Sequence, residues 1–303
     1  MLLNFPITNF WGELAALGAA CLWALSAVIY AHLGQKIPPL LLNLSKGVIA
    51  IALIAFTLIL QGDYFPTAIN AITLTILLLS GVVGIGLGDT FYFEALNNLG
   101  ARRTLLVQAL APPLAALIAL IFLHESLSLK AWVGILLTVL GVAWVISERV
   151  PAAGKAVNLL RGISFALLSA IGQAGGAVLS RAALAETTIS PLWSTLLRLV
   201  GGVLILLLWM PFKQPLNLWF KPLQSKQLLG IIAVTAVFST YLGIWLQQTA
   251  IKYTATGIAQ ALLSTSPLFV LPIALWMGEK VTFRAVLGVI VAIAGIGLLF
   301  SWH

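Results

Sequence analysis

Ten apolar segments of roughly membrane-spanning length follow one another along the chain, and no other feature limits the possible folds as strongly. A transmembrane helix needs about 20 predominantly apolar residues. The composition agrees, because 61% of the residues are hydrophobic and only 8% are charged, whereas a soluble domain carries about 25% charged residues. We therefore predict an all-α integral membrane protein with ten transmembrane helices, and we exclude a soluble enzyme, a disordered chain and a nucleic-acid-binding domain. The segments are Leu14–Leu33, Pro39–Leu60, Ile72–Phe93, Leu105–Phe122, Ala131–Ile146, Ile163–Leu184, Leu192–Met210, Leu229–Gln248, Ile258–Met277 and Val286–Phe300.

The two halves of the sequence are similar to each other. When the chain is shifted by 154 residues, positions 101–147 align with 255–301 and nine of them are identical. The identical pairs include Pro113 and Pro267, Glu125 and Glu279, Ala131 and Ala285, Gly134 and Gly288, and Gly141 and Gly295.

This similarity predicts two five-helix repeats, at 12–147 and 162–301, joined by a polar linker at 148–161. Because five is an odd number, the second repeat enters the membrane from the opposite side, and the repeats are inverted. Many secondary transporters have this architecture, with the substrate site between the two halves.

Basic residues predict the orientation. The 16 lysines and arginines form no run, so the net charge of +8 indicates topology and not a nucleic-acid partner. Loops on the side of the termini hold three of them, and loops on the other side hold eleven. Cytoplasmic loops are enriched in Lys and Arg, so we expect both termini outside.

Two basic residues lie at equivalent depths in the two halves. Lys46 is seven residues after Pro39, and Arg198 is seven residues after Pro191. A charge within a membrane helix is costly and normally pairs or faces water. We expect these residues to attract an anion or carboxylate at each mouth of a central cavity. The alternatives are snorkelling towards the helix end and a fixed pair with a carboxylate.

Acidic residues divide into two groups. Asp89 and Glu94 are the only carboxylates that we place near the apolar zone, and they are candidates for carrying a coupling proton or for neutralising the basic pair. Glu125 and Glu279 precede the fifth and tenth segments, where a carboxylate complements a helix N-terminus, so we expect them to be structural.

Polar and aromatic side chains at helical spacing predict the walls of a transport path. Residues three or four positions apart share a helix face, as do Trp23, Ser26 and Tyr30. The alternatives are that polar groups join helices and that aromatic residues form interfacial belts. The candidate substrate-binding residues are Lys46, Arg198, Trp23, Ser26, Tyr30, Tyr92, Gln108, Gln173, Tyr241, Trp245, Gln248, Gln260 and Ser264.

Prolines interrupt the fourth and ninth segments. Pro113 and Pro267 remove backbone hydrogen bonds there, as broken helices at transporter sites do, although a simple kink has the same sequence signature. We treat both residues as structural.

Enzyme and metal motifs are absent. The sequence has no Walker A loop and no H-E-x-x-H motif, and its three histidines are scattered at segment ends. We therefore expect no enzyme activity, no cofactor and no metal.

The repeat motif of glutamate, Ala-x-x-Gly and a later glycine, together with the basic residue early in the second and seventh segments, resembles the EamA family of the drug/metabolite transporter superfamily. The resemblance covers nearly the whole chain. It implies a polytopic carrier of small metabolites, with amino-acid exporters among its members and carriers of nucleotide sugars and triose phosphates among its relatives.

We thus expect an alternating-access secondary transporter that exports amino acids or related small polar metabolites across an inner or plasma membrane. Its expected partners are a small-molecule substrate, the lipid bilayer, and a proton or counter-substrate. The alternatives are a carrier for phosphorylated metabolites or drugs and a non-transporting membrane scaffold protein. The oligomeric state stays open.

Overall fold

The computed structural model of the chain describes residues 10–34, 36–63, 66, 69–99, 104, 107–147, 159–185, 187–210, 225–266, 268–269 and 283–300. Regular structure within these ranges is entirely helical. The first half contains α1 (Trp11–Leu33), α2 (Pro39–Gln61), α3 (Ala71–Gly81), the π-helical segment η2 (Val82–Gly88), α4 (Asp89–Leu99), α6 (Ala111–Phe122) and α7 (Leu129–Ser147). The second half contains α8 (Leu159–Leu184), α9 (Pro191–Trp209), α11 (Lys226–Ala236), the π-helical segment η5 (Val237–Leu242), α12 (Gly243–Tyr253), α13 (Thr256–Leu263) and α15 (Phe283–Phe300).

Helix starts follow from local chemistry at several points. Proline occupies the first position of both α2 and α9, where it loses no hydrogen bond. The side chain of Asn70 accepts a hydrogen bond from the backbone of Thr73 at the start of α3. Ser190 and Ser225 cap α9 and α11 in the same way, because a side-chain oxygen satisfies a free amide at the N-terminus.

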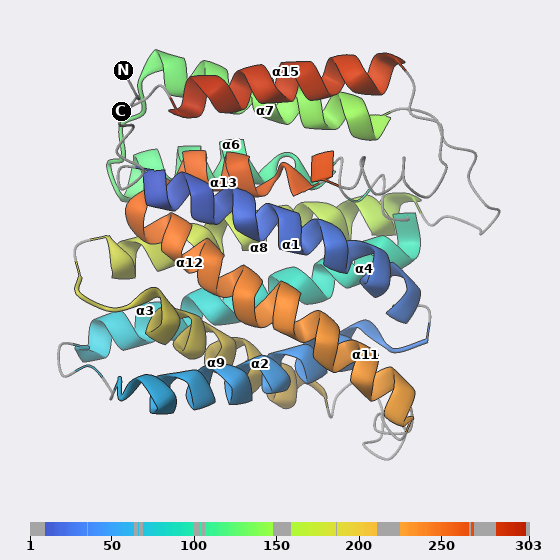
Figure 1. Cartoon of the computed structure of the whole chain (residues 1–303), viewed down its shortest axis with the longest axis vertical. Coiled ribbons are helices and arrows are strands. Elements are labelled where there is room, and N and C mark those ends of the chain that lie inside the picture. The colour runs from blue at the N-terminus through green and yellow to red at the C-terminus, as the bar shows by residue number, and fades with distance from the viewer. Residues whose placement is uncertain are drawn as a thin grey trace, which may run out of the picture.

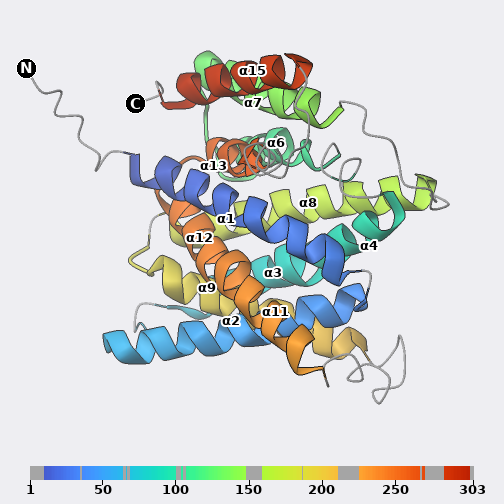
Figure 2. The same ribbon diagram turned by 45° about the vertical axis from the view of Figure 1, so that its right-hand side comes forward.

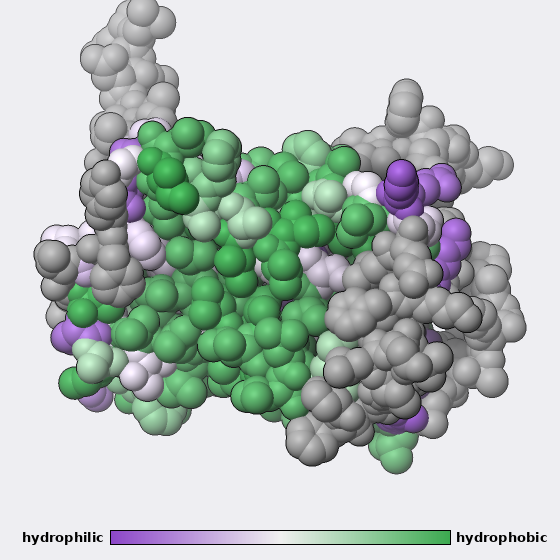
Figure 3. All heavy atoms as spheres, turned by 90° about the horizontal axis from the view of Figure 1, so that it is seen from below, coloured by the Kyte–Doolittle hydropathy of each residue, from purple (hydrophilic) through white to green (hydrophobic). Residues whose placement is uncertain are grey.

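Long apolar helices confirm an all-α membrane protein. Among the described residues, five helical stretches are long and apolar enough to cross a membrane: Pro39–Gln61, Ala71–Leu99, Leu159–Leu184, Pro191–Trp209 and Lys226–Tyr253. Shorter apolar helices lie at Trp11–Ser26, Ala111–Phe122, Leu129–Trp144 and Val286–Leu299. Figure 3 shows one face of the molecule, where hydrophobic residues cover the middle and hydrophilic residues gather towards its two edges. This distribution suits a protein surrounded by lipid.

Helices of the two halves pack against each other rather than forming two separate bundles. α1 packs against α12, α2 against α9, and α7 against α15. α8 packs against α3, η2 and α4, and α13 packs against α6. α7 and α15 form a pair at one edge of the molecule (Figures 1 and 2). The centre of the molecule is therefore built from both halves.

Glycines allow close contacts between these helices, for example between η2 and α8. A Cβ atom added to Gly176 would lie 2.8 Å from the Cα of Gly84, and one added to Gly172 would lie 3.1 Å from the Cα of Gly88. The first distance is shorter than real Cβ contacts and the second is tighter than most of them, so a side chain at either position would require η2 and α8 to shift. Small residues spaced four apart permit such close packing of membrane helices.

Two pairs of segments differ from the simple prediction. The third and eighth segments are longer than expected, at 29 and 28 residues, and each contains a π-helical turn. The fourth segment is interrupted by a turn at Ala109 and Leu110, after which α6 begins with Pro112 in its first turn. In the ninth segment α13 ends at Leu263, and Pro267 lies outside the described residues.

Candidate functional site

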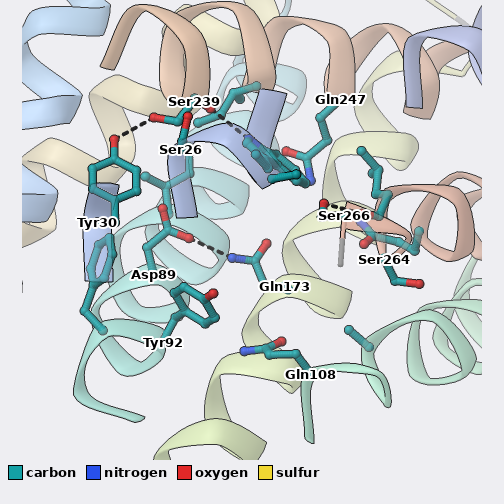
Figure 4. A pocket seen from close by; sticks show the side chains of 18 of the residues that line it. Ser26, Tyr30, Asp89, Tyr92, Gln108, Gln173, Ser239, Gln247, Ser264 and Ser266 are labelled. Carbon is teal, nitrogen blue, oxygen red and sulfur yellow. Dashed lines mark hydrogen bonds between the residues drawn. The ribbon is translucent and has the colours of Figure 1, made fainter. Parts of the chain in front are cut away.

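A cavity of about 260 Å³ lies in the centre of the molecule, between the two halves. Its wall combines polar side chains with an apolar majority from both halves, and Figure 4 shows the polar groups pointing into the same space. The described lining residues are Trp23, Ala24, Ser26, Tyr30, Lys46, Ile85, Asp89, Tyr92, Phe93, Leu96, Gln108, Ala109, Ala111, Pro112, Val142, Gln173, Arg198, Ser239, Ile244, Gln247, Gln260, Leu263, Ser264 and Ser266.

Most of the predicted site residues meet at this cavity. They are Trp23, Ser26, Tyr30, Lys46, Asp89, Tyr92, Gln108, Gln173, Arg198, Gln260 and Ser264. Four others lie elsewhere: Tyr241, Trp245, Gln248 and Glu94 are not among the residues that line it. The cavity adds Ser239 and Gln247, which the sequence reasoning missed.

Lys46 forms an ion pair inside the cavity. Its Nζ lies 2.5 Å from Oδ2 of Asp89, and the two side chains are 7% and 17% exposed. Oδ1 of Asp89 accepts a hydrogen bond of 2.7 Å from Nε2 of Gln173 (Figure 4). Both carboxylate oxygens thus have a donor. Lys46 has the carboxylate partner that the sequence left as one alternative, and it also lines the cavity.

Aromatic rings surround the same ammonium group. Nζ of Lys46 lies 5.2 Å from the ring centre of Phe93 and 5.9 Å from that of Tyr30. Such rings attract a cation through their negative faces. The hydroxyl of Tyr30 lies 2.5 Å from Oγ of Ser239, which fixes the ring. The Lys46 side chain is consequently held from three directions.

Arg198 has a different environment, although its position in α9 matches that of Lys46 in α2. It is 1% exposed, and its Nη1 donates a long hydrogen bond of 3.5 Å to Oε1 of Gln247. Within the part of the chain that the structure describes, its Nε is buried without a hydrogen-bond partner. Among the described residues, no carboxylate lies within 4.0 Å of it. This guanidinium is the least satisfied charge of the cavity.

The π-helical segments shape the cavity wall. A π turn interrupts the regular backbone ladder and is frequent at functional sites. Around η2, Asn43 donates to the carbonyl of Ile85 at 2.8 Å, and Ser169 donates to that of Gly88 at 2.8 Å. Side chains of α2 and α8 therefore complete the hydrogen bonding of this irregular backbone.

Equivalent residues of the two halves bind equivalent π segments. Gln173 of α8 donates to the carbonyl of Gly84 at 3.3 Å, and Trp23 of α1 donates to that of Ser239 at 2.8 Å. Gly84 and Ser239 each stand two residues after the start of their π segment. The first helix of each half thus supports the π segment of the other half.

The eighth segment presents a different face from the one predicted. The predicted face of Tyr241, Trp245 and Gln248 assumes regular α-helical spacing, but the cavity residues are Ser239, Ile244 and Gln247. Ser239 and Ile244 are five positions apart, as the π turn of η5 requires. The extra residue of that turn therefore changes which side chains point inward.

The polar residues of the predicted face, Tyr241 and Gln248, bind neighbouring helices. This is the alternative role that the sequence analysis gave for polar groups. The Tyr241 hydroxyl lies 2.9 Å from that of Thr57 in α2, and the Tyr241 and Trp245 rings pack 6.2 Å apart. Gln248 accepts a hydrogen bond of 2.8 Å from Ser194 of α9. These contacts lie outside the cavity wall.

Glu125 does not cap the helix that follows it, α7, as expected, but binds α13 and α8 of the other half. Its Oε2 accepts from the backbone of Thr256, at the start of α13, at 2.9 Å, and its Oε1 accepts from Nε of Arg181 in α8 at 2.6 Å. Ser128 accepts from the amide of Ala131 in the first turn of α7 instead. Glu125 therefore stabilises a helix N-terminus of the other half, because the fold brings α13 closer to it than the free amides of α7.

Two acidic residues and one proline are left to place in the structure: Glu13, Glu279 and Pro113. Glu13 in the first turn of α1 is 1% exposed, so Asp89 and Glu94 are not the only carboxylates in buried surroundings. Pro113 lies within the first turn of α6, next to Pro112. Glu279 lies outside the described residues. Among the residues that the structure describes, no three His, Cys, Asp or Glu side chains are grouped as metal ligands.

Comparison with known proteins gives a family and a fold. Residues 10–147 and 160–301 each match the EamA-like transporter family. A protein of known crystal structure superposes with a TM-score of 0.76 over 95% of this chain and 94% of its own, at 17% sequence identity. No curated protein matches the sequence.

Proposed function

Because the chain belongs to the EamA-like transporter family, we propose that it is a secondary transporter that exports amino acids or related small polar metabolites by alternating access. The observation that carries this proposal is the central cavity. It lies between the two halves, contains a buried guanidinium and several amide side chains, and is otherwise apolar. Largely apolar pockets with a few converging polar groups are typical of small-molecule sites.

The proposed architecture is ten transmembrane helices in two inverted repeats. Two matches to one family model, each covering about half of the chain, support the duplication. The five long apolar stretches and the shorter apolar helices support the spans. In inverted-repeat transporters, one half moves against the other around a central site.

In the conformation that the structure describes, hydrogen bonds between helices support a cavity that is closed on the side of the termini. A cluster of hydrogen bonds lies there: Arg181 binds Glu125 and the carbonyls of Ile251 and Lys252, and Lys252 binds the carbonyl of Ile189. The cavity residues of α1 instead belong to its later part, from Trp23 onwards. With the termini outside an inner or plasma membrane, the substrate would enter from the Lys- and Arg-rich cytoplasmic side.

Asp89 is the proposed coupling residue. It is the carboxylate that lines the cavity within the described part of the chain, and it binds both Lys46 and Gln173. A proton on Asp89 would remove the charge that holds Lys46. Because Lys46 lies in α2 and Asp89 in α4, protonation of Asp89 would break the ion pair between these helices. Proton binding would thereby be linked to the position of α2 relative to α4.

Flux measurements test the proposal. Proteoliposomes loaded with a panel of amino acids should release at least one of them, and the cavity variant Gln247→Leu should alter the KM or rate of release. The adjacent Gln248→Leu is the matched control, because Gln248 binds Ser194 outside the cavity wall. Circular dichroism and elution in detergent establish that both variants fold.

The outcomes separate the alternatives. No flux for any amino acid, together with flux of phosphorylated compounds, would support the alternative carrier. No flux of any metabolite pool would support a non-transporting membrane protein. Equal effects of the two glutamine substitutions would show that the cavity wall is not the path.

A further inference from the structure

The described wall of the cavity contains more positive than negative charges. Its described lining contains two cations, Lys46 and Arg198, and one carboxylate, Asp89. The ion pair of Lys46 and Asp89 is already closed at 2.5 Å, and Gln173 occupies the other carboxylate oxygen. The described wall therefore keeps one positive charge, on Arg198.

Arg198 is prepared to bind an anion. A guanidinium carries five N–H donors, and within the described part of the chain the hydrogen bond that this one makes is the 3.5 Å contact with Gln247. A Cβ added to Gly84 would lie 3.0 Å from Nη2 of Arg198, so the absence of a side chain at Gly84 makes room for the guanidinium. Burial of a charge without a partner is strongly unfavourable, and an anionic ligand would supply that partner.

A second free donor lies on the same wall. Gln260 is 6% exposed, and its Nε2 is buried with no hydrogen-bond partner among the described residues. The unsatisfied polar atoms of Arg198 and Gln260 are both donors, whereas both oxygens of Asp89 are occupied. The described wall thus offers free donors for an anionic group and no free carboxylate for an ammonium group.

We propose that the cavity recognises small organic monoanions through a carboxylate bound at Arg198, and that a substrate's amino group is not required for binding. This inference rests on the proposed transport function and specifies its substrate class. A planar carboxylate matches the fork of a guanidinium in a bidentate contact. One negative charge neutralises the cavity, whereas a phosphate ester with about two would leave an excess.

The remaining wall suits an apolar substituent. Trp23, Phe93, Leu96, Pro112 and Leu263 supply aromatic and aliphatic surface. A volume of about 260 Å³ lies near the lower end of the range of small-molecule sites, which is about 300–1,000 Å³. The substrate is therefore a molecule of amino-acid size with an apolar body and one carboxylate.

Three compounds with one carbon skeleton test this assignment. Leucine is a zwitterion, 4-methylpentanoate lacks its amino group, and leucinamide lacks its carboxylate. Isothermal titration into the full-length protein in nanodiscs should show 4-methylpentanoate binding at least as tightly as leucine, and leucinamide binding at least tenfold more weakly. 3-Phenylpropanoate provides the same comparison for an aromatic body, and isopentyl phosphate provides the dianion.

Variants of Arg198 test whether the preference for carboxylates arises at this residue. Arg198→Gln should weaken carboxylate binding at least tenfold, and Arg198→Lys should restore part of it because the charge remains without the fork. Arg161→Gln at the exposed start of α8 is the matched control and should bind normally. The thermal unfolding midpoint of each ligand-free variant shows whether it is folded.

Several results would overturn the inference. These are a requirement for the amino group, tighter binding of isopentyl phosphate, binding unaffected by Arg198→Gln, and no binding of either amine-free carboxylate. Amino-acid flux combined with any of them would leave the proposed function intact. Binding of 4-methylpentanoate at Arg198 without flux of any compound would instead refute transport and retain the anion site.

Discussion

Replacing Lys46 or Arg198 by methionine should change the stability of the ligand-free protein in opposite directions, although each substitution removes one buried positive charge. Lys46 lies 2.5 Å from Asp89, so its loss leaves a carboxylate in the cavity without its counter-ion. Breaking a buried ion pair by removing one partner costs about 3–5 kcal/mol. Because Asp89 keeps its bond to Gln173, we expect about 3 kcal/mol, the lower end of that range.

Arg198 has no carboxylate partner to lose among the residues that the structure describes. It is 1% exposed, and within the described ranges its Nε is unpaired and its hydrogen bond is the 3.5 Å contact with Gln247. Replacing a buried ion pair by apolar residues of similar volume often stabilises a protein by about 1–4 kcal/mol, and Arg198 has no carboxylate among the described residues whose attraction would be lost. Since Oε1 of Gln247 loses a donor, we expect a gain of about 1–2 kcal/mol for Arg198→Met.

Thermal unfolding in one detergent, followed by tryptophan fluorescence, measures both effects. At about 2 °C per kcal/mol for a chain of this size, the midpoint should fall by about 6 °C for Lys46→Met and rise by about 2–4 °C for Arg198→Met. Lys226→Met, at the exposed start of α11, is the control and should change stability by no more than about 0.5 kcal/mol. Equal losses for the two cavity variants would refute the reasoning, because Arg198 would then have a compensating partner within the protein.

Three other predictions concern packing, the termini side and coupling. Gly176→Ala should destabilise the protein by about 1–3 kcal/mol, since its Cβ would meet the backbone of η2, whereas Gly230→Ala, with open space around it, should be neutral or stabilising in denaturation experiments. Glu125→Gln should lower the free energy of unfolding by about 1–3 kcal/mol, because Arg181 then loses its counter-ion; an unchanged value would mean that water already screens this pair. Flux through Asp89→Asn should no longer respond to a pH gradient in proteoliposomes, and unchanged flux and pH dependence would exclude Asp89 as the coupling residue.

Much of the fold can be predicted because its signals are local. Apolar segments locate the long helices, and prolines locate the starts of α2 and α9 within a residue. The matching positions of Lys46 and Arg198 predict their presence at one cavity. Each of these features depends on side-chain type and spacing within a single helix, which a sequence displays directly.

The structure differs from the sequence-based expectation where distant residues determine local geometry. The sequences of η2 (VVGIGLG) and η5 (VFSTYL) do not predict a π-helix. The hydrogen-bond donors that support these segments, such as Asn43 and Trp23, come from other helices. The π turn of η5 then moves Gln247 into the cavity and Gln248 out of it. Two adjacent glutamines in an apolar segment indicate a polar role, but the α-helical period selects Gln248, whereas Gln247 lines the cavity.

Duplication has preserved the cations of the cavity but not their counter-ion. When η2 is aligned with η5, by a shift of 155 residues, Asp89 of the first half corresponds to Ile244 of the second. Both residues line the cavity, so the two halves contribute equivalent basic groups and only one carboxylate at this position. The internal ion pair therefore forms on one side of the pseudo-symmetric site and not on the other. An anionic substrate would supply for Arg198 the partner that Asp89 supplies for Lys46, and the asymmetry of the two halves would then determine the orientation of the bound molecule.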